Sequence, residues 1–361
     1  MRFDCDDLDD LALGSVFLAT GGGGDPHVPK LIAQQALTHY GPVDIIAPEA
    51  LDDEAWVVAL GSVGAPTVGL ELLPSLDEAA ETLAAFEAHT GRQVDAIVSF
   101  EIGGGNSLIP LVAAAARGVP VVDGDGMGRA LPEAQMMSYA IGGISPTPAV
   151  AYDYAGNIVT FSTSDTLVYE RHIRSLAMAA GGMITTAEHP MTGAELKATV
   201  IPETLSFARD LGAVLRKHRG LAEDLFAPLQ AAFAETIYGE VRLLHVGKVV
   251  DKQTRIVGGY DIGEAVIAPF ERDGEACRVD IKNEYLLARR GDKIMASVPD
   301  LIVIVDYETS VPINAERLRY GQRVAIFAIG CPAFYRNETA LNFVAPRCFG
   351  FDMDYVPLEQ L

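Results

Sequence analysis

The spacing of hydrophobic and polar residues alternates between two patterns over the first 150 residues. Apolar residues at helical spacing predict four helices, over residues 5–19, 28–40, 76–90 and 107–117. Short apolar runs rich in β-branched residues predict four buried strands, at residues 43–46, 56–60, 96–100 and 119–122. This alternation is typical of an α/β domain, in which helices cover a mainly parallel sheet.

The pattern changes after about residue 150. A hairpin is predicted over residues 152–162, and three helices follow at 166–180, 202–218 and 222–236. From residue 242 to about 344, short β runs separated by turn residues predict a β-rich domain, a small barrel or sandwich. The runs cover residues 246–251, 255–260, 265–270, 276–283, 301–306 and 324–329. We therefore expect an α/β domain over 1–165, then a helical segment and a β-rich domain over 166–361. The length of 361 residues also favours two domains.

The charge of the chain narrows the range of partners. It has 27 Lys and Arg against 49 Asp and Glu, a net charge of −22. Such a field repels nucleic acid and anionic membrane surfaces, which leaves a small-molecule substrate as the expected partner. No apolar stretch is long enough to span a membrane, and the four cysteines lie far apart. We expect a cytoplasmic protein; the sequence leaves its oligomeric state open, a homo-oligomer included.

The first candidate loop joins the first two predicted helices. It contains Gly21, Gly22, Gly23 and Gly24, followed by Asp25. Glycines accept positive φ and let a ligand approach backbone N–H groups, which here would form an anion-binding nest for substrate. The loop lacks the G-x-G-x-x-G spacing and does not follow a strand, so no nucleotide cofactor is predicted. A flexible turn between helices is the alternative.

The second candidate loop follows a predicted strand and opens a helix, where α/β sheets bind their ligands. Glu101, at the end of the strand, is expected to point into the crevice as a general base. Gly104 and Asn106 are expected to contact substrate. The alternatives are a surface carboxylate for Glu101 and a helix N-cap for Asn106 or Ser107.

The third candidate loop follows the next predicted strand and gathers charged residues. Asp123, Asp125 and Glu133 are candidate ligands for one divalent metal ion, because carboxylates two residues apart suit a hard cation. Asp125 is also a candidate general base, and Arg129 a candidate partner for negative charge. An acid-rich turn stabilised by Arg129 is the alternative. The chain has no H-E-x-x-H or C-x-x-C zinc motif.

Three further side chains could take part in chemistry. His27 adjoins the first loop, and His189 lies in a segment that is expected to be a loop. Cys331 could serve as a nucleophile, but a lone cysteine without a base beside it is more often an inert small apolar residue.

Taken together, the three loops resemble the signature of the S-methyl thiohydantoin desulfurase-like family, found beside hydantoinase/oxoprolinase genes. The likeness extends over nearly the whole chain. It continues through His189–Gly193, Asn283–Glu284, Val298–Leu301, Tyr320–Val324 and Pro346–Asp352.

This resemblance implies hydrolysis at C2 of a five-membered imidazolone ring, which releases a thiol and leaves a hydantoin. It also implies zinc as the assisting metal. Water would be activated by a metal on Asp123, Asp125 or Glu133, or by Glu101, while the glycine nest or Arg129 holds a substrate carboxylate or the developing anion. The alternative is a non-catalytic ligand- or nucleotide-binding partner of a hydantoinase/oxoprolinase-type complex.

Overall fold

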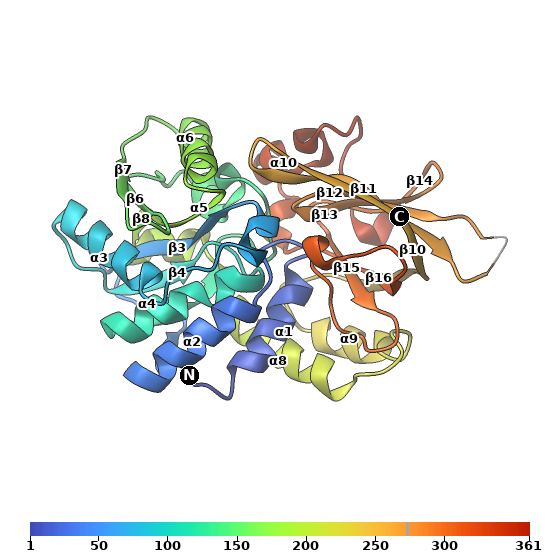
Figure 1. Cartoon of the computed structure of the whole chain (residues 1–361), viewed down its shortest axis with the longest axis horizontal. Coiled ribbons are helices and arrows are strands. Elements are labelled where there is room, and N and C mark those ends of the chain that lie inside the picture. Colours follow the sequence, from blue (N-terminus) through green and yellow to red (C-terminus); the bar gives the residue numbers. More distant parts are fainter. Residues whose placement is uncertain (272–273) are drawn as a thin grey trace.

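The computed structural model describes residues 1–271 and 274–361, which form two lobes (Figure 1). An α/β lobe lies on the left in this view, and a lobe built on an antiparallel sheet lies on the right. No helix in these two ranges is long and apolar enough to cross a membrane.

The sheet of the α/β lobe has a parallel centre, as predicted. Its order is β2 (Val43–Ile46), β5 (Val121–Asp125), β4 (Ala96–Ser99) and β3 (Trp56–Gly64). Antiparallel strands extend it: β1 (Arg2–Phe3), β8 (Met183–Thr192), β6 (Ala149–Tyr152), β7 (Ile158–Phe161) and β9 (Ile201–Pro202). Strands β6 and β7 form the predicted hairpin. Strands β8 and β9 come from beyond residue 165, so the first sheet is completed by later parts of the chain.

Helices pack on this sheet and on one another, α1 against α8 and α2 and α3 against α4. The helices are α1 (Leu8–Leu18), α2 (His27–Tyr40), α3 (Glu78–Thr90), α4 (Ile109–Arg117), α5 (Ser138–Ile141), α6 (Thr166–Ala179), α7 (Gly193–Thr199), α8 (Thr204–Lys217), α9 (Phe226–Phe233) and α10 (Glu338–Val344). All seven helices predicted from the sequence are present, with bounds that differ by a few residues.

The second lobe confirms the predicted β-rich region as a seven-stranded antiparallel sheet, curled into a half-barrel. Its order is β14 (Lys293–Ser297), β13 (Glu284–Arg290), β12 (Cys277–Lys282), β11 (Tyr260–Pro269), β10 (Val241–Val257), β16 (Arg323–Ile329) and β15 (Leu301–Asp306). The sequence predicts two short strands where the structure has the single long β10. A bulge near Val249 bends this strand without ending it.

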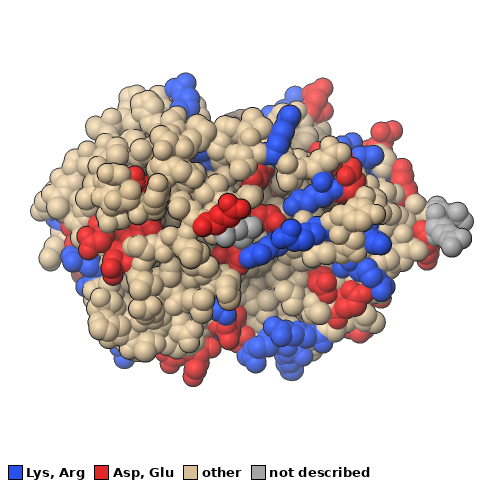
Figure 2. Space-filling model, viewed as in Figure 1, with Lys and Arg blue, Asp and Glu red and all other residues tan. Residues whose placement is uncertain are grey.

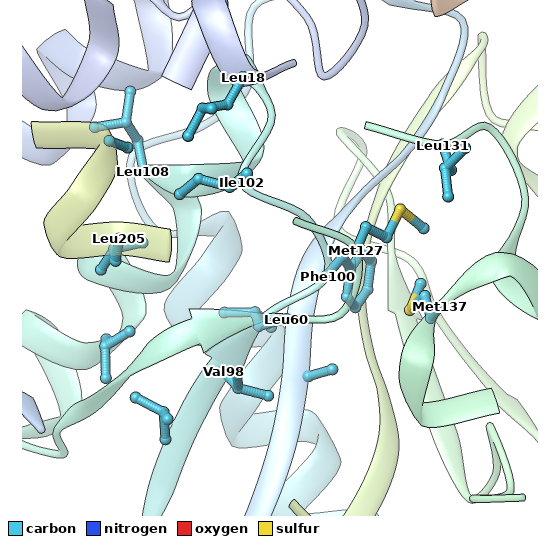
Figure 3. Close-up of a cluster of buried hydrophobic side chains, with 14 of the residues drawn as sticks. Leu18, Leu60, Val98, Phe100, Ile102, Leu108, Met127, Leu131, Met137 and Leu205 are labelled. Atoms are coloured by element: carbon cyan, nitrogen blue, oxygen red, sulfur yellow. The ribbon is translucent and has the colours of Figure 1, made fainter. Parts of the chain in front are cut away.

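The larger hydrophobic core lies beneath the candidate loops and is shared by both lobes. Figure 3 shows Phe100, Met127 and Met137 close together at one side of this core. The same cluster includes Val303 and Phe327 of the second sheet. Burial of apolar surface therefore stabilises the lobes as one packed unit.

Candidate functional site

A cavity of about 160 Å³ opens where the carboxyl ends of β3 and β4 meet the start of β13. Its polar walls include Glu101 and Asn106 from one lobe and Asn283 and Glu284 from the other. A cavity of about this volume holds one small ring, since a cavity of roughly 150 Å³ binds benzene. The position at the ends of parallel strands is where α/β sheets bind ligands.

Two glycine-containing loops cross at the edge of the cavity in direct backbone contact. The N–H of Gly105 donates to the carbonyl of Gly23 at 2.8 Å. A Cβ on Gly104 would lie 2.0 Å from the carbonyl oxygen of Gly24, and both residues have positive φ. Glycine is thus required here for the crossing itself.

The second lobe holds the first loop in place. The Asn314 side-chain amide donates to the carbonyls of Gly22 and Gly24, both at 3.2 Å. Asp25 accepts a hydrogen bond from Arg317 Nε at 2.6 Å. These contacts argue against the alternative that the first loop is a flexible turn between two helices. Charged side chains of both signs meet along the boundary between the lobes (Figure 2).

The predicted substrate-binding residues divide into two groups. Gly23, Gly24, Asp25 and Asn106 line the cavity. The other three, Gly21, Gly22 and Gly104, lie behind it and pack against Tyr285, Glu284 and the first loop respectively.

Two buried carboxyl groups from different lobes line the cavity. Glu101 is 6% exposed and Glu284 is 2% exposed. Each carboxyl group packs closely against a glycine of one of the crossed loops. A Cβ added to Gly103 would lie 3.2 Å from Glu101 Cδ. A Cβ added to Gly22 would lie 2.1 Å from Glu284 Oε1. The structure therefore brings together an acid to which the sequence gives a catalytic role and one, Glu284, that it names only within the family resemblance, without a role.

Burial makes both groups weak acids. It raises the pKa of Glu101 to about 8, against the opposing effect of a hydrogen bond from Asn106. Burial also raises the pKa of Glu284 well above its usual range, and the nearby charge of Glu101 raises it further. Within the described residues, Glu284 Oε2 has no hydrogen-bond partner. Such a pair of titrating groups is typical of acid–base sites.

Asn106 fixes the orientation of Glu101. Its side-chain amide donates to Glu101 Oε1 at 2.8 Å, and its Oδ1 accepts from the N–H of Ser62 at 2.8 Å. Helix α4 begins after Leu108 without a side-chain cap, so the N-cap role considered for Asn106 is wrong. Ser107 likewise caps no helix, because its hydroxyl donates to the carbonyl of Gly104.

Asp125 holds the second and third loops together from behind the cavity. Its carboxylate accepts from the N–H groups of Ile102, Met127 and Gly128, at 2.8, 2.9 and 2.8 Å. Burial raises the pKa of Asp125 to about 7, although these hydrogen bonds act in the opposite direction. Asp125 does not line the cavity. We therefore regard it as a residue that positions Glu101.

The structure does not assemble the predicted metal ligands. Asp123 accepts from the N–H of Ser206 at 2.9 Å, and Glu133 forms an ion pair with Lys282. Asp125 is occupied by backbone donors. Across residues 1–271 and 274–361, no group of three or more His, Cys, Asp or Glu side chains is placed to hold a metal ion. The structure thus gives no support to Asp123, Asp125 and Glu133 as a ligand set, and metal binding by the chain stays a prediction.

Arg129 also differs from expectation, because it is fully buried and does not line the cavity. Its Nη1 donates to the carbonyls of Pro299 and Asp300 at 2.9 and 2.8 Å. Its Nη2 donates to Thr20 Oγ1 at 2.7 Å, and its Nε to the carbonyl of Ala130 at 2.9 Å. The guanidinium joins the lobes and is not presented to a substrate anion.

His189 lies within β8 instead of the predicted loop. Its φ of 49° interrupts the alternation of the strand, and its Nδ1 lies 3.3 Å from Oε1 of the neighbouring Glu188. Glu188 lines the cavity and accepts hydrogen bonds from Tyr169 and Thr186. No role is predicted for Glu188 from the sequence, because a single acid in an expected loop carries no motif.

The two other side chains considered for chemistry lie elsewhere. His27 is exposed at the start of α2. Cys331 is buried, and this burial raises the pKa of its thiol to about 12. A thiol that stays protonated is a poor nucleophile, which favours the inert role for Cys331.

Comparisons with known proteins cover nearly the whole chain. The family model described as "S-Me-THD-like, N-terminal domain" matches residues 6–163, and "S-Me-THD-like, C-terminal domain" matches residues 163–358. A crystal structure of a protein from Chromobacterium violaceum aligns with a TM-score of 0.78 at 23% identity, over 99% of this chain and 100% of that chain. At this identity the likeness shows the fold alone. No curated protein matches the sequence.

Proposed function

Because the chain belongs to the S-Me-THD-like family, we propose that it is a hydrolase that cleaves the C–S bond of an S-alkyl thiohydantoin or a related imidazolone. The reaction would release a thiol and leave a hydantoin. The observation that supports this proposal best is the placement of Glu101 and Glu284, one from each lobe, in a single cavity of ring size.

The two acids differ in how well the site stabilises their charge. An N–H of Asn106 stabilises the Glu101 carboxylate, whereas Glu284 has a carboxyl oxygen without a partner among the described residues. We therefore assign the general-base role to Glu101 and the general-acid role to Glu284.

Protons balance over the two steps of this mechanism. Glu101 takes a proton from water as the water oxygen bonds to C2, and Glu284 gives its proton to the ring nitrogen. The C–S bond then breaks: Glu101 returns its proton to the departing sulfur, and Glu284 takes the proton of the new hydroxyl as C2=O forms. Both carboxyl groups end as they began, and the products are a hydantoin and a thiol.

The rate of thiol release is expected to rise with pH through about 8. Glu101 must be ionised to accept a proton from water, and its raised pKa keeps it protonated below that pH. Initial rates with an S-methyl thiohydantoin, followed with a thiol reagent between pH 6 and 9, measure this. A rate that does not change with pH would contradict the assignment of Glu101. A rate equal to that without protein would favour the non-catalytic binding role.

The proposed proton transfers use Glu101 and Glu284 alone, so binding of the predicted divalent ion is tested by a separate experiment. The carboxylates of the third loop predict about one divalent ion per chain and the resemblance implies zinc, although the ligands expected from the sequence do not converge. Elemental analysis of protein purified without chelator tests this. About one ion per chain would confirm the prediction and require other ligands, whereas metal-free protein that releases thiol would contradict it.

A further inference from the structure

The segment that joins β3 to α3 forms part of the cavity wall. We call residues 65–77 the strap; they contain one short 3-10 helix, Pro66–Leu70. The strap residues that line the cavity are Pro66, Gly69, Leu72, Pro74 and Ser75. Between and beside them, Leu73 and Leu76 are 64% and 46% exposed. A single thickness of chain therefore separates this part of the cavity from solvent.

The strap is held to the rest of the protein near its first residues. The N–H of Ala65 donates to the carbonyl of Gly182 at 3.2 Å. A Cβ added to Gly182 would lie 2.7 Å from Val68 Cγ2, so the strap packs directly on this glycine. Thr67 contacts the second lobe, because its hydroxyl and its N–H donate to Asp261 Oδ2 at 2.5 and 3.1 Å.

Beyond Thr67, the hydrogen bonds of the strap stay within it or join it to the first turn of α3. Within the parts of the chain that the structure describes, no hydrogen bond joins residues 68–77 to any other element. Every residue from 71 to 77 except Leu72 is exposed. A segment with few outside bonds and little buried surface can open while the core stays folded.

Leu72, the inward side chain of this exposed part, rests beside Tyr154. A Cβ added to Gly181 would lie 3.4 Å from Tyr154 Cε1 and 3.9 Å from Leu72 Cδ2. Leu72 and Tyr154 both line the cavity. The far part of the strap is therefore seated by apolar packing over Gly181, which breaks more easily than a ladder of backbone hydrogen bonds.

The residue that holds Thr67 is bound to the opposite wall of the cavity. The N–H of Asn283 donates to the carbonyl of Asp261 at 2.8 Å, and the N–H of Asp261 donates to Asn283 Oδ1 at 2.9 Å. Asn283 lines the cavity and directly precedes Glu284. The strap is thus fixed to the same short segment that carries Glu284.

We propose that the strap is a lid. It lifts off Gly181 and Gly182 to admit or release a ligand, and the hydrogen bond from Thr67 to Asp261 holds it closed across the boundary between the lobes. This inference goes beyond the proposed reaction, because it concerns access to the cavity and holds for any small ligand that the cavity binds.

The rate at which a thiol inside the cavity reacts with a soluble thiol reagent measures opening of the strap without any ligand. Thr185→Cys places this thiol, because Thr185 lines the cavity and is 5% exposed. Cys5→Ser and Cys348→Ser remove the two native thiols that are not buried. We expect the thiol at position 185 to react slowly. Thr67→Val should speed its reaction about tenfold or more, the effect of losing a hydrogen bond to a charged group.

Two controls distinguish opening of the strap from a general loss of stability. Thr254→Val removes an exposed hydroxyl from β10 and should leave the rate unchanged. Cys277 and Cys331 are each 1% exposed and lie outside the cavity, so their reaction reports wider unfolding. Their rates should not change in Thr67→Val. If Thr185→Cys does not fold, Ser62→Cys replaces it, because Ser62 also lines the cavity.

Three results would overturn the inference. A cavity thiol that reacts as fast as Cys348 does in the unaltered chain would show that the cavity is accessible while the strap is in place. Equal rates with and without Thr67→Val would show that this hydrogen bond holds no lid. A cavity thiol that reacts only together with Cys277 and Cys331, in every variant, would show that the strap stays closed until the chain unfolds.

Discussion

Glu101→Gln is expected to lower the turnover of an S-methyl thiohydantoin by a factor of about 10² or more, the range for losing a general base. The amide keeps the shape of the side chain and can still accept from Asn106, so KM should change much less than kcat. The pH dependence of the remaining rate through about pH 8 should also disappear. Glu284→Gln should lower kcat by a similar factor, since an amide gives up no proton.

The same Glu101→Gln variant should be more stable than the wild type at pH 8. The pKa of Glu101 is higher in the folded chain than its ordinary value of 4.5, so the folded state binds the proton more tightly. The wild type then loses stability as pH rises from about 4.5 to 8, and the glutamine variant does not. Thermal melting at pH 5 and pH 8 measures the difference.

Two controls distinguish this effect from general damage. Glu54→Gln alters an exposed carboxylate and should leave both turnover and melting temperature nearly unchanged. Asp125→Asn puts an NH₂ group among three backbone donors, so it should lower stability and turnover together. A Glu101→Gln variant with wild-type turnover would remove Glu101 from the reaction.

Arg129→Met is expected to lower the free energy of unfolding by several kcal/mol, because each buried acceptor left without its donor costs about 1–3 kcal/mol. The substitution leaves the carbonyls of Pro299 and Asp300 and the hydroxyl of Thr20 without their donor. Arg129→Lys should recover only part of the loss, because an ammonium lacks the planar fork of a guanidinium. Urea unfolding measures these changes.

Arg171→Met is the matched control, because Arg171 is exposed on α6. Its effect should stay within about 0.5 kcal/mol. If Arg129→Met unfolds like the wild type but no longer binds hydantoin, the guanidinium serves the ligand and not the contact between the lobes.

The sequence predicts the α/β lobe well because its elements are long and their periodicity is local. It predicts β12, β15 and β16 but not β13 or β14. Asn283 alone connects β12 to β13, and its positive φ reverses the direction of the chain. Because this turn contains no glycine or proline, the sequence does not indicate where β12 ends and β13 begins. The sequence places His189 in a loop for the opposite reason, because Pro190 within β8 and Gly193 directly after it resemble turn signals.

The site is harder to predict, because its parts are distant in sequence. Glu101 is marked by its position after a strand. Its partner Glu284 lies in the other lobe, and the sequence names it only as part of the family resemblance, with nothing that indicates a role. The spacing of Asp123 and Asp125 shows that they could converge; it does not show that Ser206 and backbone N–H groups already bind them. Competition from such donors depends on tertiary contacts.

The pairing of β3 with β8 bears on where the chain can be divided. The two family models meet at residue 163, but β8 begins at Met183. A fragment ending at 163 would leave one side of β3 with unpaired N–H and C=O groups, the kind of open edge that recruits other chains into aggregates. The regions matched by the two family models must therefore be expressed as one chain, or refolded together, to give a protein that does not aggregate.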